Sequence, residues 1–161
     1  MKISTLLRCS VLLLALQAQA DNLVGKVVHV ADGDTLTVLD DAKTQHKIRL
    51  AGIDAPESKQ AFGQVSKHSL ADQVAGQVVA VEWDKVDRYG RKVGKVILGS
   101  QDANLRQIQL GLAWHYKAYA QEQSPADRKA YAEAELVAKA AKLGLWKDAA
   151  PEPPWEFRRT K

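Results

Sequence analysis

From Val24 onward, short runs of alternating apolar and polar residues are separated by polar bends. Alternation with a period of two is typical of strands that bury one face. The connection from Asp40 to Lys43 is polar and suits a hairpin loop. The pattern therefore predicts three antiparallel strands, marked in turn by Val24, Val28 and Val30, by Leu36 and Val38, and by Ile48 and Leu50.

The spacing becomes helical from Ala61 to Val74, and Gly76 follows as a stop signal. One side of this helix is expected to carry Phe62, Val65, Leu70 and Val74. The stretches Val78 to Trp83 and Lys92 to Leu98 return to strand character, joined across a turn at Tyr89-Gly90. Five strands interrupted by a helix predict a small closed barrel.

Two further helices are marked by their end residues. Either Asp102 or Asn104 suits the cap of a short helix that Gly111 ends. The second runs to Leu143, with the best start signal of the chain in Ser124, Pro125 and Asp127. Beyond Trp146, the Pro-rich and basic segment 148–161 is expected to be an extended or mobile tail.

The first twenty residues have the organisation of a signal peptide. Met1 to Arg8 carries only positive charge, Cys9 to Leu16 is almost wholly apolar, and Ala18-Gln19-Ala20 has the small-x-small form of a cleavage site. We expect residues 1–20 to be removed and the protein to be periplasmic or secreted from a bacterium, without stable membrane association. The alternative is an uncleaved membrane anchor.

Removal of the leader leaves about 140 residues, enough for one domain with a hydrophobic core. The single cysteine, Cys9, lies in the leader, so the mature chain has neither disulfides nor thiolate metal ligands. The 23 basic residues exceed the 19 acidic ones only slightly once Lys2 and Arg8 leave with the leader. Overall charge alone therefore does not establish nucleic-acid binding.

Acidic residues gather where predicted strands end. Asp34 follows a bend at Asp32-Gly33, and Asp54 and Glu57 follow another strand. Each group alone suits an ordinary turn. If the three carboxylates converge, their repulsion destabilises the fold unless a cation lies among them, and oxygen ligands suit Ca²⁺ or Mg²⁺.

Arg49 and Arg91 add an anion-binding element to this picture. A metal beside two guanidinium groups suits phosphate, whose oxygens gain charge in the transition state. Glu57 is a candidate to accept a proton from water or to orient that water. The alternatives are a structural salt bridge for Arg49 and an ordinary surface charge for Arg91.

Four motifs in this order resemble the staphylococcal nuclease family: "DGDT" from Asp32, "RLAGIDAPE" from Arg49, "DRYGR" from Asp87 and "GLAWHY" from Gly111. The resemblance extends from about Val24 to about Trp146. It implies an α+β fold, a five-stranded OB-fold β-barrel with about three flanking helices, in a nuclease domain at 21–147. It also implies a Ca²⁺-dependent nuclease that hydrolyses the 5′ P–O bond of DNA and RNA with little sequence specificity, leaving 3′-phosphate ends.

The resemblance also implies residue roles. Asp34 and Asp54 would bind the metal together with the main-chain carbonyl of Ala55, where family members often have Thr. Phosphate would be bound by Arg49 and Arg91. Glu57 would be the general base or the water-orienting group. A monomer acting on nucleic acid is expected.

Aromatic residues near these motifs are candidates for stacking on unpaired bases, with core packing as the competing explanation. They are Tyr89, Trp114 and Tyr116. Single-stranded substrate is accordingly expected to be preferred. The rival functions are a non-catalytic OB-fold module that binds single-stranded nucleic acid and a Ca²⁺-stabilised structural domain. Binding alone does not need three acids, because they repel phosphate.

Overall fold

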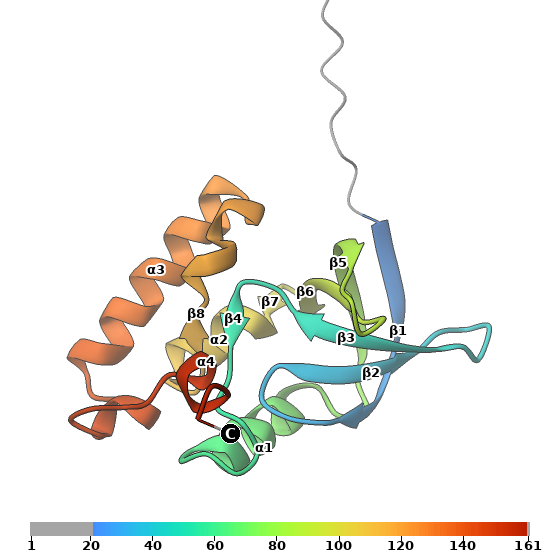
Figure 1. The fold of residues 1–161 in the computed structure, drawn as a ribbon. Helices are drawn as coiled ribbons and strands as arrows, with labels where there is room; N and C mark the ends of the chain where they lie inside the picture. The colour runs from blue at the N-terminus through green and yellow to red at the C-terminus, as the bar shows by residue number, and fades with distance from the viewer. Residues whose placement is uncertain (1–20, 161) are drawn as a thin grey trace, which may run out of the picture.

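A computed structural model describes residues 21–160 of the chain (Figure 1). The predicted signal peptide, residues 1–20, lies outside the described residues. Within 21–160, every helix is too short or too polar to cross a lipid bilayer.

Five strands form a closed barrel, as the sequence predicts. They are paired in the order β3-β2-β1-β5-β6, antiparallel throughout, and a parallel pairing of β3 with β6 closes the ring. The strands are β1 (Asp21–Val30), β2 (Thr35–Leu39), β3 (Gln45–Leu50), β5 (Val78–Val86) and β6 (Lys92–Leu98). The barrel encloses a core that includes Leu36, Val38, Ile48, Leu50, Val81 and Val96.

The predicted inward residues of β1 are partly wrong. Val24 and Val28 are 58% and 44% exposed, whereas Val27 and Val30 are buried. The pairing of β1 with β2 shifts register between Val27 and His29. Such a bulge adds one residue and reverses which side chains face inward, so a strict period of two fails within this strand.

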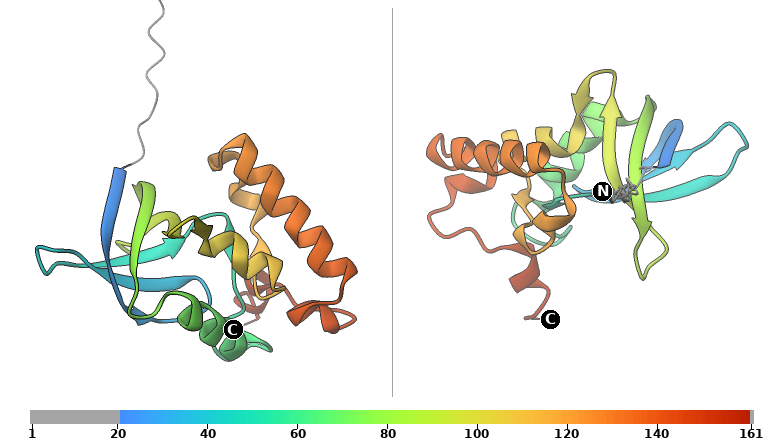
Figure 2. Two further views of the ribbon diagram at one scale, coloured as in Figure 1. Left: turned by 180° about the vertical axis from the view of Figure 1, so that it is seen from behind. Right: turned by 90° about the horizontal axis from the view of Figure 1, so that it is seen from above.

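Helices and short strands cover one side of the barrel, and both views in Figure 2 place α3 opposite the β2–β3 hairpin. A second, two-stranded sheet of β4 (Ile53–Asp54) and β8 (Trp114–His115) lies next to the helices. The other elements are α1 (Gly63–Val74), β7 (Gln101–Asp102), α2 (Ala103–Gln109), η1 (Lys117–Glu122), α3 (Pro125–Ala140), η2 (Gly144–Lys147) and α4 (Pro154–Phe157).

The predicted face of α1 needs correction. Phe62 precedes the helix with a left-handed backbone (φ 64°) and packs against a satellite cluster around Trp146. Val65 is 52% exposed, and its expected place in the interior is taken by Ser66. Ser66 is fully buried because its hydroxyl donates to the carbonyl of Leu112 at 2.7 Å.

The ends of α2 and α3 follow their capping signals closely. Asp102 caps α2 by accepting from the Leu105 amide. Ser124 caps α3 through the Asp127 amide. Helix α3 ends at Ala140, before the predicted Leu143, because the backbone becomes left-handed at Lys142 (φ 51°).

The segment after Trp146 differs most from expectation. Instead of extended chain, it contains the one-turn helix α4, which starts with Pro154 at its first position. Pro154 is buried, and the Gln60 side-chain amide donates to the carbonyl of Glu152 at 2.6 Å. Figure 1 shows this C-terminal segment, in red, lying beside β4.

Candidate functional site

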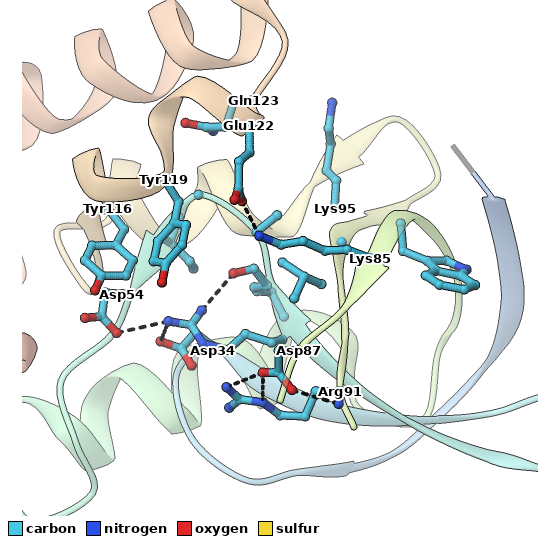
Figure 3. Close-up of a pocket in the computed structure, with 18 of the residues that line it drawn as sticks. Asp34, Asp54, Lys85, Asp87, Arg91, Lys95, Tyr116, Tyr119, Glu122 and Gln123 are labelled. Atoms are coloured by element: carbon cyan, nitrogen blue, oxygen red, sulfur yellow. Dashed lines mark hydrogen bonds and ion pairs between the residues drawn. The ribbon is translucent and has the colours of Figure 1, made fainter. Parts of the chain in front are cut away.

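A cleft of about 730 Å³ lies where one end of the barrel meets β4, η1 and the C-terminal segment. Eight of the predicted site residues line it: Asp34, Arg49, Asp54, Ala55, Glu57, Tyr89, Arg91 and Tyr116. The structure therefore brings together residues from four separate motifs. Figure 3 shows Asp34 and Asp54 close together, with Tyr116 and Tyr119 beside Asp54.

Asp34 is positioned by the bend that precedes β2. Its amide donates to the Asp32 carboxylate at 3.0 Å, so Asp32 shapes the turn. Its own carboxylate accepts from the Ala55 amide at 2.6 Å. At Gly33 the bend approaches α1 so closely that a Cβ would lie 1.9 Å from the Ser66 hydroxyl. The bend thus both reverses the chain and positions the buried carboxylate of Asp34.

Arg49 joins the two buried acids. Its Nη2 atom lies 3.2 Å from Asp34 Oδ2 and 3.0 Å from Asp54 Oδ1. Its Nη1 atom donates to the Leu50 carbonyl at 2.7 Å. Arg49 pairs with Thr35 across β3 and β2, and Asp54 follows on β4. The strand register therefore brings the carboxylates of Asp34 and Asp54 to the same guanidinium nitrogen of Arg49.

Negative charge is crowded here. Burial raises the pKa of Asp54, and the hydrogen bond from Arg158 together with the charge of Arg49 only partly opposes this. Burial and the neighbouring charge of Asp34 raise the pKa of Asp32 to about 6. A carboxyl group with a raised pKa is in surroundings that favour its neutral form. An additional cation would relieve this cost.

Arg91 is fixed by its own hairpin. The Asp87 carboxylate accepts from the Arg91 side chain at 2.7 Å and from the backbone amides of Tyr89 and Arg91. Burial raises the pKa of Asp87, but these hydrogen bonds outweigh it and hold the pKa below its ordinary value. The Nη1 atom of Arg91 lies 3.4 Å from the Thr35 hydroxyl, next to Asp34. One guanidinium edge is thereby held toward the acids.

Glu57 lies at the edge of the cleft, after Pro56. Its side chain is 39% exposed, so water reaches it. Its Oε1 atom accepts from Arg158 at 2.8 Å. Sequence reasoning did not anticipate this contact with the C-terminal segment.

The three predicted aromatic residues are placed differently. Tyr116 lines the cleft, with the Tyr119 ring 5.1 Å away. Tyr89 is highly exposed at the hairpin tip, with the Arg91 guanidinium 5.4 Å from its ring. Trp114 packs edge-on against Trp146 at 4.3 Å, within the cluster beside α3. Tyr116 is thus the best placed of the three for a base.

Several residues of the cleft have no role predicted from sequence: Lys85, Asp87, Lys95 and Tyr119. For Arg158, which also lines the cleft, the sequence predicts a place in a loose charged tail, with non-specific attraction to phosphate as the alternative. Asp87 carried a usable signal, since a carboxylate four residues before Arg91 across a Gly turn suits a local ion pair. Lys85 and Lys95 are paired with Glu122 and Asp127. Arg158 carried no such signal, because its partners lie a hundred residues away.

The oxygen donors in the cleft suit a hard cation that takes only a few of its ligands from the protein. Within residues 21–160 there is no group of three or more His, Cys, Asp or Glu side chains arranged to hold a metal. Asp34 and Asp54 still present carboxylate oxygens beside the backbone of Ala55. Ca²⁺ accepts such oxygens together with water and phosphate, so these residues fit part of a calcium shell.

Comparison with known proteins identifies the family of the chain. A family model described as "Staphylococcal nuclease homologue" matches residues 47–148. The chain is 41% identical to a micrococcal nuclease of Shigella flexneri, over 92% of this chain and 87% of that protein. It is also 41% identical to an uncharacterised endonuclease of Haemophilus influenzae, over 83% of this chain and 72% of the relative. The predicted relationship and fold class are confirmed: the chain belongs to the staphylococcal nuclease family and is a nuclease.

Proposed function

We propose that this nuclease is a Ca²⁺-dependent phosphodiesterase that hydrolyses DNA and RNA with little sequence specificity and leaves 3′-phosphate ends. The observation that carries the proposal is the shared guanidinium of Arg49, which holds Asp34 and Asp54 together in one cleft. Glu57 and Arg91 line the same cleft. This combination provides oxygen ligands, phosphate-binding groups and a proton acceptor.

Asp34, Asp54 and the carbonyl of Ala55 are the proposed metal ligands. Bound there, Ca²⁺ would supply positive charge to the scissile phosphate. The raised pKa of Asp54, caused by burial, supports this role because a buried carboxylate that lacks full compensation favours a cation. Ala55 contributes only a backbone atom, so its small side chain does not conflict with the role.

The two arginines are proposed to bind the phosphate. Hydrogen bonds to Asp87 leave the Arg91 guanidinium little freedom, which reduces the cost of ordering it on substrate. Guanidinium groups strengthen their interaction as charge builds on the phosphate oxygens. Arg49 acts from β3, where its guanidinium lies 3.2 Å from Asp34 and 3.0 Å from Asp54.

Glu57 is proposed to accept a proton from the attacking water or to orient it. The water oxygen bonds to phosphorus, and the 5′ P–O bond breaks. The 5′ oxygen leaves as a hydroxyl after taking a proton, and the phosphate stays on the 3′ oxygen. A solvent-accessible carboxylate at the cleft edge suits this task.

Low sequence specificity follows from the kinds of groups in the cleft. Charged side chains contact phosphate, which is the same in every nucleotide. Tyr116 and Tyr119 offer aromatic faces that stack on any unpaired base, which supports a preference for single strands. We further propose that the monomeric domain 21–147 is exported to the periplasm or medium after cleavage of residues 1–20, with 148–161 as an appended segment.

The alternative that the sequence leaves open is a non-catalytic binding module. Such a module has no use for Asp34, Asp54 and Glu57 in one cleft, since acids repel the phosphate backbone. A Ca²⁺-stabilised structural domain has no use for Arg91 held in position by Asp87.

The test is digestion of plasmid, single-stranded DNA and RNA by the mature protein, with Ca²⁺ or with a chelator. Glu57→Gln and Arg91→Ala are each expected to lose about 100-fold in kcat or more, because positioned acid-base and anion-stabilising groups typically contribute that much. Ends extendable by polymerase only after phosphatase treatment would identify 3′-phosphates.

Matched controls are Glu133→Gln and Arg106→Ala, exposed residues on α3 and α2. They make the same chemical changes away from the cleft and should keep wild-type rates. Digestion that ignores the chelator, or that persists in both site variants, would refute the proposal.

A further inference from the structure

The C-terminal segment 151–160 places two side chains on the candidate site at once. Trp155 and Arg158 are three residues apart, at the spacing that puts them on one side of a helical turn. Arg158 lines the cleft. Trp155 lies against Tyr116, which also lines it.

Arg158 binds two carboxylates with central roles in the proposed function: Asp54, a proposed metal ligand, and Glu57, the proposed proton acceptor or water-orienting group. Its Nη2 atom lies 2.7 Å from Asp54 Oδ2, and its Nη1 atom lies 3.2 Å from Asp54 Oδ1 and 2.8 Å from Glu57 Oε1. The hydrogen bonds that Arg158 donates to Asp54 and Glu57 raise the pKa of Arg158. The guanidinium therefore grips Asp54 in a fork and bridges it to Glu57.

Trp155 takes the position that a base would need. Its ring stacks on Tyr116, with centroids 5.5 Å apart and an interplanar angle of 14°. Its edge contacts Trp114, also at 5.5 Å. Near-parallel stacking on Tyr116 is the geometry expected of an unpaired nucleobase.

The segment is anchored so that both contacts form together. Pro153 and Pro154 restrict the backbone entering α4, and Pro154 is buried. The bond from Gln60 to the Glu152 carbonyl fixes the start of the segment near Glu57, whose amide contacts the same Gln60 side chain. Gln60 and Glu152 lie outside the cleft, so Trp155 and Arg158 can move out of the cleft while the bond between Gln60 and Glu152 is kept.

We propose that residues 151–160 form an intramolecular latch that competes with Ca²⁺ and nucleic acid for the cleft. The inference rests on the proposed function, because it assigns Asp54 to the metal and Tyr116 to the base. A guanidinium on both Asp54 oxygens and a Ca²⁺ ligated by the same carboxylate repel each other and exclude each other sterically. The segment must therefore move before metal and substrate are held together.

The energetics allow this exchange. The Arg158 side chain is 43% exposed and that of Glu57 39% exposed, so water screens this ion pair and it is weak. The partner Asp54 is only 2% exposed, so its ion pair with Arg158 is the stronger contact, and Ca²⁺ must replace the positive charge that Arg158 supplies there. The latch thus lowers the apparent affinity for metal by the fraction of molecules in which it is closed.

The decisive measurement is Ca²⁺ affinity by calorimetry for the wild type, Arg158→Ala and the matched control Arg159→Ala. Arg159 is exposed and its side chain makes no ion pair within residues 21–160, so it tests loss of charge alone. Arg158→Ala should bind Ca²⁺ at least about fivefold more tightly than the wild type. A fivefold change in affinity is about the lower end of the usual coupling between two sites. The control should stay within about twofold of the wild type.

Two further variants separate the parts of the latch. Arg158→Lys keeps the charge but loses the fork, so its Ca²⁺ affinity should fall between those of the wild type and Arg158→Ala. Trp155→Ala should lower KM for a single-stranded oligonucleotide. In protein labelled with 5-fluorotryptophan, the ¹⁹F resonance of Trp155 is identified by its absence from the Trp155→Phe variant. This resonance should shift when Ca²⁺ and a substrate analogue are added.

Weaker or unchanged Ca²⁺ binding by Arg158→Ala, with a raised KM, would overturn the latch and make Arg158 a phosphate-binding residue. Absence of Ca²⁺ binding in every variant, with digestion insensitive to chelator, would instead refute the proposed function and the latch with it. Normal Ca²⁺-dependent digestion with an unmoved Trp155 resonance would refute the latch alone.

Discussion

Two fully buried carboxylates, Asp54 and Glu135, lie on elements that both contact β8 but have opposite electrostatic environments. Asp54 is 1% exposed on β4, and Glu135 on α3 is 2% exposed. Glu135 accepts from the amide of His115 on β8, the strand that pairs with β4. The comparison is therefore between neighbours with similar burial.

Glu135 is fully satisfied by its own chain. Besides the His115 amide at 3.1 Å, it accepts from Lys117 at 2.6 Å and from Lys139 at 3.0 Å. Burial raises the pKa of Glu135, but the hydrogen bonds from the two lysines outweigh it and lower the pKa below its ordinary value.

For Asp54 the balance is reversed. Burial outweighs Arg158 and Arg49, and the pKa is raised. Arg49 is shared with Asp34, and Arg158 with Glu57, so neither guanidinium serves Asp54 alone. A structural carboxylate is compensated by dedicated partners, whereas a candidate ligand is left short of positive charge.

The largest expected effect comes from neutralising Asp54. Asp54→Asn should lower kcat by about 10³-fold, since it removes a proposed metal ligand and its electrostatic contribution. Its thermal stability in chelator should not fall. A folded pKa above the ordinary value means that the charged form is disfavoured in the folded protein at neutral pH, so a neutral side chain is tolerated.

Calorimetry beside an activity assay checks both parts. A variant that keeps wild-type activity would remove Asp54 from the proposed site. A large loss of stability would show that Asp54 is structural in the way that Glu135 is.

Local sequence signals predicted the barrel and identified many residues that line the cleft. Strand β6 has the predicted bounds Lys92–Leu98, because alternation and turn residues are local properties. The motif from Arg49 to Glu57 brought its residues to one cleft as expected. Their roles in metal and phosphate binding remain predictions.

What sequence reasoning missed depends on distant contacts. Ser66 is buried because of a hydrogen bond to Leu112, which helical periodicity does not encode. The bulge in β1 arises from pairing with β2. Arg158 meets Glu57 across 101 residues, and a Pro-rich, charged tail gave no reason to expect it in the cleft.

The second prediction concerns Glu135. Glu135→Ala should reduce the free energy of unfolding by about 3 kcal/mol, because it leaves a buried amide and two lysines without their acceptor. The folded fraction should retain wild-type kcat, since the cleft is intact. Urea denaturation and active-site titration measure the two quantities, and a loss of kcat without destabilisation would reverse the comparison.

The third prediction is a pH dependence. The folded pKa of Glu135 lies below its ordinary 4.5, so its contribution is present above that value and is lost as pH falls through the folded pKa. Glu135→Gln should cost about 1–2 kcal/mol at pH 7. The difference from wild type should shrink below pH 4.5. A difference that is constant from pH 7 to pH 3 would rule out charge as its source.

The smallest effect is expected at Lys117, whose side chain is 66% exposed. Lys117→Ala should cost only about 0.5 kcal/mol, because Lys139 still compensates Glu135 and exposed ion pairs contribute little. Lys139→Ala should behave similarly, since its side chain is also partly exposed.

The double variant should cost more than the two single variants combined, because only then is a buried carboxylate left without a cation. Additive costs in urea denaturation would mean that the lysines do not act on one charge. The same cycle predicts that the double variant raises the pKa of Glu135, which brings its environment toward that of Asp54.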